Sequence, residues 1–585
     1  MGRMESTNGL RAVLATAFAI PLAVFAVNPD WFITNIFLPP WFDAFIYRGL
    51  FQHPVEYIKG HPDYYPATRM PYIAYGAAFY ALLPPLAANF AMKLVLAVSA
   101  LATLGLALLR LVGASTAILV LIVAGTYPFF VMAMGWDYID GFSIVLTAAA
   151  YACIVTAARR GDRSGPWDFL AGLCFGLTVA CNLFAVTLAP SLALFYLAVL
   201  VPAPRLPGQG LRLFARIAFA IIGLAAALGA SSGLSVLFGG GADVIEQQLR
   251  AAIRLSGPER QLVAFAGYAN HLPVASWLIL PAAAVLAAIV LALRSWRHRD
   301  VFAALMAGHY LVLSAIYVWV TAVSLAALLF WFYVSYLLVP AFVTIACALG
   351  PSRERASVLA FAAIPLVAVH LPWIGAPAQL ALGLFIFSWM PVSKVIWWTA
   401  PGLLLTAIAH RLRSWRGATV RIAGVLVLAA GWLAMLNWPQ LCFYPGQPPR
   451  IDGFRAALDA VEFIRAASSN PRRYLWVDRE EPAFYGLLFH SIWIESLPSS
   501  KYWPIGFEGS TKFPALPPHE IKPGDPLVIL TSRPDWRERA EEALRGAGLS
   551  IGDVDEMEIR HGAVAFKAAV VSASTFARPI DKPER

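Results

Sequence analysis

Charged side chains are scarce in this sequence. Only 13% of its 585 residues are Asp, Glu, Lys or Arg, whereas 59% are apolar. Soluble domains carry about 25% charged residues, so the composition excludes a wholly soluble protein. Uncharged apolar runs of about 20 residues recur along the first three quarters of the chain, and a helix of that length spans a bilayer. We expect the membrane part to be helical, because an open sheet leaves backbone groups unpaired in lipid.

Several functional motifs are also missing. Four of the five cysteines lie in apolar segments and Cys442 has no obvious partner, so no disulfide framework is predicted. No Cys/His spacing suggests zinc, and the glycines at 239–241 are not followed by the Lys-Ser/Thr of a P-loop. Residues 1–438 hold 26 Lys/Arg against 14 Asp/Glu, so the basic excess lies in membrane loops. A nucleic-acid binder would concentrate it on one soluble face, so we expect no nucleic-acid partner.

The positions of the basic residues predict the topology. Arg3 and Arg11 precede the first apolar run, which has no convincing cleavage site, so we interpret it as a retained span with a cytoplasmic N-terminus. Residues 71–87 are broken by prolines and are predicted to be juxtamembrane helices. This choice puts the cluster at 159–163 inside, as the positive-inside rule requires. The thirteen predicted spans are 12–27, 90–110, 115–134, 142–158, 168–184, 185–201, 215–237, 274–294, 301–322, 328–349, 356–372, 393–410 and 419–438.

The chain is expected to have two parts. Residues 1–438 form the membrane domain and residues 439–585 form an outer, periplasmic soluble domain, since the composition changes near 439. The large outer loops of the membrane domain are 28–89 and 239–273; 243–255 is predicted to be an amphipathic helix along the interface, and 373–392 is left as an outer loop or a re-entrant piece. In the soluble domain we expect helices at 454–467 and 534–544 and strands at 474–478, 527–530 and 564–571. The predicted fold is an α-helical polytopic protein of the inner (plasma) membrane with a small C-terminal α/β domain.

Acidic residues are rare enough in the membrane part to be placed one by one. None of the 14 lies in the middle of a predicted span, and nine fall on predicted outer loops. Coupled transporters usually need polar groups deep in several spans, whereas only Asn182 and a few Ser/Thr are found there. This placement argues against a coupled transporter and puts any acid–base chemistry on the outer surface.

Two acidic sites are candidates for that chemistry. Asp43 lies in the first outer loop among aromatic residues, within Pro39-Pro40-Trp41-Phe42-Asp43-Ala44-Phe45-Ile46-Tyr47-Arg48. Asp137 and Asp140 lie in the tight turn between the third and fourth spans, where their spacing of three puts both on one face if the turn is helical. For all three carboxylates the alternative is a helix cap.

One cation suits a phosphate group. Arg69 stands at the outer surface among aromatic residues, just before a helix that starts with Pro71. Guanidinium pairs with phosphate through two hydrogen bonds, so Arg69 is a candidate for binding a lipid-linked phosphate. The alternative is an arginine that reaches lipid headgroups. Further candidates to line the site, for which belting of the membrane interface or contact with headgroups is the alternative, are Tyr47, Tyr64, Tyr65, Trp136, His271, Tyr333 and Tyr336.

The arrangement resembles the GT-C superfamily of membrane glycosyltransferases, which includes protein O-mannosyltransferases, the lipid A aminoarabinose transferase and single-subunit oligosaccharyltransferases. The resemblance lies in Asp43 followed by Tyr47, in the second acidic site at Asp137 and Asp140, and in a core of about thirteen spans with an outer soluble domain. This sequence departs from the commonest first-loop pattern of the superfamily, because Ala44 and not Glu follows Asp43.

The resemblance implies an inverting transferase that moves a sugar from a polyprenyl-phosphate donor to a lipid, glycan or protein acceptor. Asp43 would be the general base and Arg69 would stabilise the leaving phosphate. Asp137 and Asp140 would orient the sugar or acceptor, or hold a divalent cation with Asp43; no cofactor is expected to be required. Two other readings stay open: a flippase or transporter of lipid-linked sugars, and a non-enzymatic membrane assembly protein.

Overall fold

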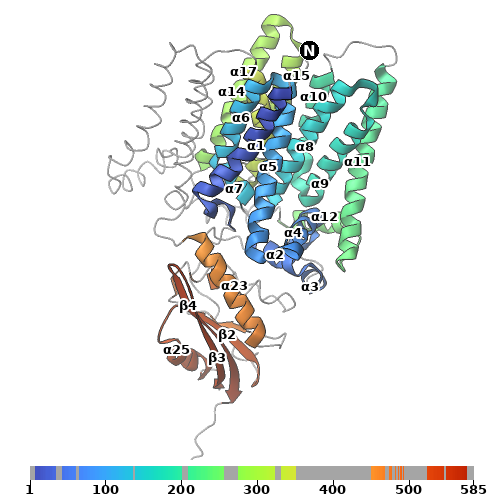
Figure 1. Cartoon of the computed structure of the whole chain (residues 1–585). Coiled ribbons are helices and arrows are strands. Elements are labelled where there is room, and N and C mark those ends of the chain that lie inside the picture. The colour runs from blue at the N-terminus through green and yellow to red at the C-terminus, as the bar shows by residue number, and fades with distance from the viewer. Residues whose placement is uncertain are drawn as a thin grey trace, which may run out of the picture.

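The computed structural model describes a helical bundle joined to a small sheet domain (Figure 1). The N-terminal end of α1 lies at the far end of the bundle from the sheet domain. The described residues are 7–33, 43–60, 65–135, 139–200, 209–255, 274–322, 328, 331–350, 449–467, 474–476, 523–545 and 549–575, with single positions between 481 and 492.

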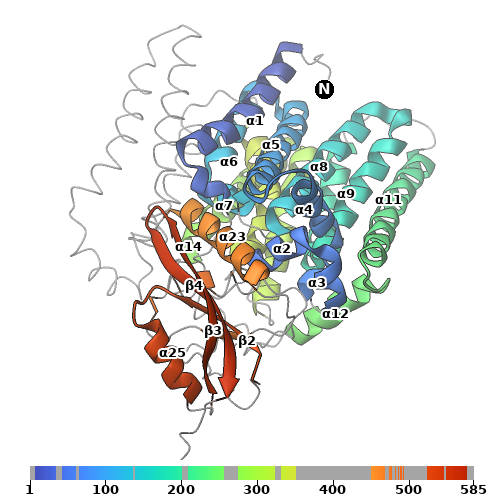
Figure 2. The same ribbon diagram turned by 60° about the horizontal axis from the view of Figure 1, so that its bottom comes forward.

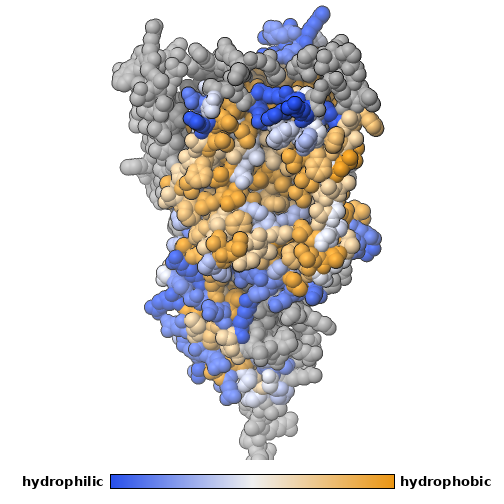
Figure 3. All heavy atoms as spheres, turned by 45° about the vertical axis from the view of Figure 1, so that its right-hand side comes forward, coloured by the Kyte–Doolittle hydropathy of each residue, from blue (hydrophilic) through white to orange (hydrophobic). Residues whose placement is uncertain are grey.

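Seven stretches of the described helices are long and apolar enough to cross a membrane. They lie in α1 (Thr7–Val27), α5 (Pro85–Val112), α8 (Ile139–Arg160), η4 with α10 (Leu183–Leu200), α11 (Gln209–Leu237), α14 (Val274–His298) and α15 (Val301–Val320). Phe214, Ile221 and Ile222 on α11 are more than half exposed in the isolated chain. Such exposed apolar side chains form a band with hydrophilic residues at both ends, as expected of a surface that faces lipid (Figure 3).

The ten spans predicted within the described residues all coincide with apolar helices, but three of them are broken. The span predicted at 115–134 consists of α6 (Ala114–Thr126) and α7 (Pro128–Gly135), with a bend of 65° between them. Pro128 disfavours helical geometry at Tyr127, which is extended at φ −69° and ψ 120°. The predictions at 356–372, 373–392, 393–410 and 419–438, and the boundary at 438/439, lie outside the described residues.

The second broken span is the one predicted at 328–349. It consists of α16 (Trp331–Val334), the 3-10 turn η7 (Ser335–Leu337) and α17 (Leu338–Leu349). Pro340 has no N–H to donate to the carbonyl of Tyr336, so the regular hydrogen-bond pattern of the helix is interrupted at this point. The break leaves Ser335 and Tyr336 at the end of a helix.

Short helices gather at the end of the bundle that faces the sheet domain. They are α2 (Asp43–Gln52), α3 (Pro54–Gly60), α4 (Met70–Leu82) and α12 (Val244–Leu255), with the 3-10 turns η1 (Pro29–Phe32) and η2 (Tyr65–Thr68). With 13 residues, α4 is too short to count among the candidate spans, in agreement with the predicted juxtamembrane helices. α9 (Gly165–Cys181) is a shorter apolar helix packed against α8 and α11.

The C-terminal domain is a four-stranded sheet with a helix on each face. Its strand order is β1 (Tyr474–Trp476), β2 (Pro526–Thr531), β4 (Val564–Thr575), β3 (Leu549–His561); β1 and β2 are parallel and the other pairs antiparallel. Val528 and Leu530 pack on the side of α23 (Arg450–Ala467). Leu527 and Ile529 pack on the side of α25 (Trp536–Arg545), because successive side chains of a strand alternate between faces.

The predicted elements of this domain are present, but β3 was not predicted. Most side chains of β3 are exposed or half-exposed, so it has no clear run of buried apolar residues. The β3–β4 hairpin turns at Gly562, which has φ +51°. A Cβ there would lie 2.1 Å from Asp452 Oδ2, so glycine lets the hairpin approach α23 closely.

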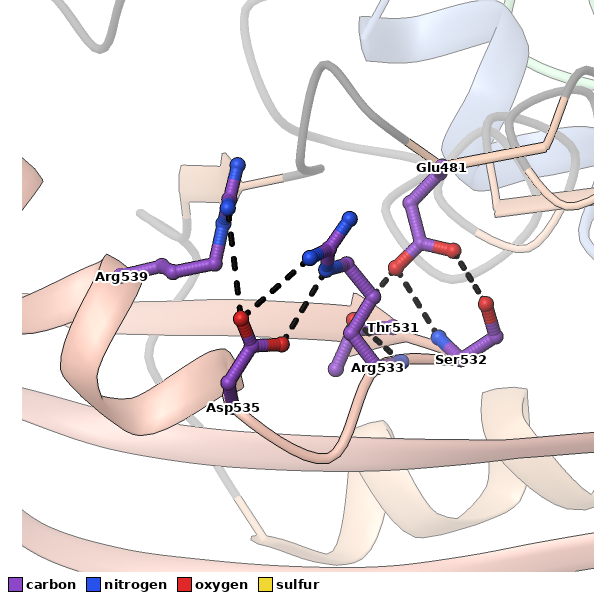
Figure 4. Close-up of polar contacts among 6 residues, drawn as sticks. All are labelled: Glu481, Thr531, Ser532, Arg533, Asp535 and Arg539. Atoms are coloured by element: carbon purple, nitrogen blue, oxygen red, sulfur yellow. Dashed lines mark hydrogen bonds and ion pairs between the residues drawn. The ribbon is translucent and has the colours of Figure 1, made fainter.

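Glu481 ties the segment after β1 to the loop after β2 (Figure 4). Its buried carboxylate accepts hydrogen bonds from the Thr531 hydroxyl, from Ser532 N at 2.9 Å and from Ser532 Oγ at 2.5 Å. Beside it, Arg533 and Arg539 pair with the more exposed Asp535. The Arg533 hydrogen bond is the main cause that lowers the pKa of Asp535.

We expect Glu481→Ala to lower the unfolding free energy of the C-terminal domain by about 2–3 kcal/mol, because it leaves one buried and two half-buried donors without their acceptor. Asp535→Asn is the control, and should cost much less because its ion pairs are partly solvated. Pulse proteolysis of the full-length protein with a C-terminal tag measures both. Equal losses in the two variants would contradict the prediction.

Candidate active site

Arg69 is buried at the sheet-domain end of the bundle, with only 2% of its surface exposed. It precedes α4, whose first turn contains Pro71, as the sequence predicts. Its Nη1 donates to the Tyr47 hydroxyl at 2.5 Å. The guanidinium carbon lies 4.4 Å from the ring centroid of Tyr65 and 5.7 Å from that of Tyr47, close enough for cation–π attraction. The charge is therefore held by aromatic side chains from α2 and η2.

Asp140 is the buried carboxylate of the same region. It stands in the first turn of α8, is 1% exposed, and feels the charge of Arg69 and the hydroxyl of Ser335. Among the described residues, the Ser335 hydroxyl is the donor that acts on its carboxylate, and most of the acceptor capacity of its two oxygens is left unused. A helix N-terminus favours a carboxylate, but a buried one normally accepts several hydrogen bonds. Among the described residues, Asp140 is thus a buried carboxyl group with unused acceptor capacity.

Polar side chains from two broken helices complete this cluster. Tyr336 on η7 donates to Ser143 Oγ at 3.4 Å and lies within electrostatic reach of both Asp140 and Arg69. Asn182 lies beside Tyr336, just after α9 ends at Cys181; it is extended at φ −154°, and its Oδ1 accepts from Phe184 N at 3.1 Å. The break at Asn182 corrects the continuous span predicted at 168–184.

Gln248 connects α12 to this cluster and was not predicted as a site residue. Its Nε2 donates to the carbonyls of Thr68 at 3.1 Å and Ala180 at 2.6 Å, the residues next to Arg69 and Cys181. Val244, Gln248 and Ala251 form the buried face of α12. Gln248 is a polar residue in an otherwise apolar stripe of α12. This pattern could have indicated from the sequence that α12 packs against protein as well as lying along the membrane interface.

The structure brings together five of the predicted site residues: Arg69, Asp140, Tyr47, Tyr65 and Tyr336. A sixth, Tyr333, is a neighbour, since its carbonyl accepts from the Tyr317 hydroxyl at 3.0 Å and its ring lies 4.5 Å from that of Phe184. Asp43 begins α2, one helical turn before Tyr47, but its side chain lies outside the described part of the chain. The same is true of the predicted residues Tyr64, Trp136, Asp137 and His271.

Polar groups also lie deep in the bundle, which corrects the expectation that only Asn182 and a few Ser/Thr are found there. His309 on α15 is buried; its Nε2 is 2.5 Å from the Tyr151 hydroxyl and its Nδ1 is 3.4 Å from Thr344 Oγ1. Lys93 on α5 is buried as well. Both lie within predicted spans, 301–322 and 90–110, so the sequence alone could have shown them.

A second buried carboxylate lies near the opposite end of the bundle. Asp168, predicted in an inner loop, is in the first turn of α9. It pairs with Arg216 through Nε at 3.0 Å and Nη2 at 3.3 Å, and it accepts from the Tyr196 hydroxyl at 2.9 Å. Asp168 is therefore fully partnered and structural, in contrast to Asp140.

No group of three His, Cys, Asp or Glu side chains that could hold a metal occurs within the described ranges. The predicted alternative of a divalent cation at Asp43, Asp137 and Asp140 involves two side chains outside those ranges. Metal independence therefore stays a prediction.

No protein-family model matches this sequence, and no curated protein matches it. Two solved structures are similar to it. One is ArnT from Cupriavidus metallidurans bound to undecaprenyl phosphate, with 15% identity over 94% of this chain and 97% of that chain and a TM-score of 0.49. The other is the Archaeoglobus fulgidus oligosaccharyltransferase tethered to an acceptor peptide, with 12% identity over 83% of this chain and 63% of that chain and a TM-score of 0.39.

Both are GT-C superfamily proteins. This is the superfamily that the first-loop and second acidic sites of the sequence resemble. The TM-scores lie below 0.5 and the identities below 25%, so the likeness alone assigns no activity to this chain.

We expect the two buried carboxylates to respond differently to neutralisation. Asp168→Asn should lower stability by about 3–5 kcal/mol, because it leaves the largely buried Arg216 without its opposite charge. Asp140→Asn should cost much less, because the described residues place few donors on its oxygens and the rings of Tyr47 and Tyr65 still face Arg69. Thermal unfolding of the purified protein in detergent measures both, and a loss of stability in Asp140→Asn as large as that in Asp168→Asn would contradict the interpretation of Asp140.

Proposed function

We propose that this chain is an integral membrane glycosyltransferase that moves a sugar from a polyprenyl-phosphate donor to an acceptor at the outer surface of the plasma membrane. The observation that carries the proposal is the buried cluster of Arg69 and Asp140 where membrane helices end. The cluster combines a cation that can bind a phosphate with a carboxylate whose oxygens can still accept hydrogen bonds from hydroxyl groups.

The position of Arg69 favours a lipid-linked anion over a free one. The apolar band of the bundle would accommodate a polyprenyl chain, and the phosphate of such a lipid lies at the level where the helices end. Arg69 presents a planar set of donors that matches phosphate oxygens, and Tyr47 and Tyr65 fix its orientation. Negative charge that develops on the departing phosphate is stabilised by a cation already in place.

The transfer step needs a base and a group that holds the sugar. We assign Asp43 as the general base that takes the proton of the acceptor hydroxyl as it attacks the anomeric carbon from the side opposite the phosphate, which inverts that carbon. Asp140, with Asp137, orients sugar or acceptor hydroxyls. Tyr47, one turn after Asp43 on α2, links the base position to Arg69.

The proposed orientation is outer for the sheet-domain end and cytoplasmic for the N-terminus. Arg159 and Arg110, near the far end of the bundle, belong to the predicted inner, basic loops, and the Arg159 guanidinium donates to the carbonyl of Arg110. The positive-inside rule places such an end in the cytoplasm.

One observation favours transport as a second candidate. His309, Tyr151 and Thr344 form a buried polar group between spanning helices, and such groups mark transport routes in some membrane proteins. Interhelical hydrogen bonding alone also accounts for them. Flipping of a fluorescent lipid-linked sugar by vesicles containing the protein, without any release of sugar, would favour transport.

The role of Arg69 is tested by binding of undecaprenyl phosphate to the protein in nanodiscs. We expect Arg69→Lys, which keeps the charge but loses the planar donor set, to weaken binding by about tenfold, and Arg69→Ala to weaken it further. Arg250→Ala is the control, because Arg250 is exposed on α12 and pairs with Glu246. Equal affinity in Arg69→Ala and the unmodified protein would refute the phosphate role.

The role of Asp43 is tested by transfer. With a panel of undecaprenyl-phosphate sugars and membrane extracts as the source of acceptor, Asp43→Asn should lower the release of undecaprenyl phosphate by at least about 100-fold, since a positioned base contributes 10²–10⁴. The affinity for undecaprenyl phosphate should be retained. Near-normal turnover would exclude Asp43 as the base.

A further inference from the structure

The helix that begins the C-terminal domain is capped by a residue of the first outer loop. Asp30 in η1 accepts from Arg450 N through Oδ2 at 3.0 Å and from Ile451 N through Oδ1 at 3.3 Å. The Arg450 side chain in turn donates to the carbonyl of Asp30 at 3.5 Å. The first N–H groups of a helix have no partner within it, and a carboxylate there also favours the helix dipole. Asp30 therefore supplies to α23 the cap that a neighbouring residue normally provides.

A second contact lies one turn further along the same helix. The guanidinium carbon of Arg48 lies 4.1 Å from the ring centroid of Phe454. Arg48 is fully buried and Phe454 is almost so, which is the setting in which a cation–π contact is strongest. Figures 1 and 2 both show α23 beside α2, so the contact joins the two domains.

Tyr47 and Arg48 are adjacent residues of α2, and their side chains contact two different parts of the molecule. Tyr47 bonds to Arg69 inside the candidate site, and Arg48 contacts Phe454 of the C-terminal domain. α2 has only ten residues, and helices shorter than about 12–15 residues are marginal without tertiary contacts. Its orientation therefore depends on what it packs against, and α23 is one of those surfaces.

We propose that the C-terminal domain is a positioning element for the active site. Docked through Asp30 and Phe454, α23 holds α2 in the orientation that places the Tyr47 hydroxyl on Arg69. Arg48 and Asp30 are positioning residues, since they act through α2 and α23 and not on the substrate. The consequence for phosphate binding and transfer rests on the proposed function, whereas the effect on the order of α2 does not.

The order of α2 is tested by hydrogen–deuterium exchange of the full-length protein in nanodiscs. Phe454→Leu removes the ring but keeps an apolar side chain, and should speed exchange of the α2 amides by about tenfold. Phe454→Tyr keeps the ring and should leave α2 as it is. Phe463→Leu is the matched control: it makes the same change on α23, nine residues or about 13.5 Å further along the helix, and should leave α2 unchanged. Unchanged exchange of α2 in Phe454→Leu would overturn the proposal.

A second variant guards against local collapse around residue 454. Asp30→Asn keeps the size of the side chain but loses the charge that caps α23, and should also speed exchange in α2. Unchanged protection of α2 in Asp30→Asn would likewise overturn the proposal, because the effect of Phe454→Leu would then be a local one.

The functional consequence is measured as affinity for undecaprenyl phosphate. Phe454→Leu should weaken it by about tenfold, and Phe454→Tyr should restore it, because Arg69 keeps its orientation only while Tyr47 is in place. Faster exchange in α2 with unchanged affinity would overturn the positioning role. If the unmodified protein does not bind undecaprenyl phosphate, the proposed function fails, and the exchange comparison alone decides whether α23 positions α2.

Discussion

The burial of Arg69 is the constraint around which this end of the molecule is arranged. A guanidinium removed from water needs aromatic faces, acceptors and an opposite charge close by, or the folded state cannot tolerate it. Tyr65 supplies a ring, Tyr47 a ring and a hydroxyl, and Asp140 the opposite charge. These partners come from η2, α2 and α8, so the position of one charge fixes how three elements meet.

The two buried carboxylates of the bundle, Asp168 and Asp140, differ in how many donors their oxygens receive. Asp168 shows what a purely structural carboxylate is like in this protein, with two guanidinium contacts and a hydroxyl on its oxygens. Asp140 has the same burial but no comparable set of donors among the described residues. Natural proteins break the rule of satisfied polar groups mainly where they function. The difference between two carboxylates of equal burial therefore makes Asp140, and not Asp168, the candidate site residue.

Local sequence patterns predicted much of this structure, but they failed where contacts between residues far apart in the sequence determine the conformation. Apolar runs located the spanning helices, because hydropathy alone determines what enters lipid. They did not show the breaks at Tyr127, Asn182 and Tyr336, although Pro128 and Pro340 carry the reason for two of them.

The scarcity of acids made Asp140 a candidate and the aromatic setting made Arg69 one, and the structure places the two within electrostatic reach of each other. Gln248 and Asp30 were missed as functional positions because each acts on backbone groups far away in sequence. No local pattern encodes such a partner. The strand β3 was missed for a different reason: it is an edge strand with one largely solvated face, so its residues lack the apolar run by which β2 was recognised.

The cap that Asp30 provides for α23 also sets an order of assembly. The carboxylate and the backbone N–H of Arg450 that it binds are 420 residues apart. At synthesis rates of about 5–20 residues per second, the ribosome needs about 20–80 seconds to make the intervening chain. During that interval the first loop exists without α23, so Asp30 and Arg48 lack the contacts that they make in the folded protein. The contact between the first loop and α23 therefore forms only after all the helices between them have been made.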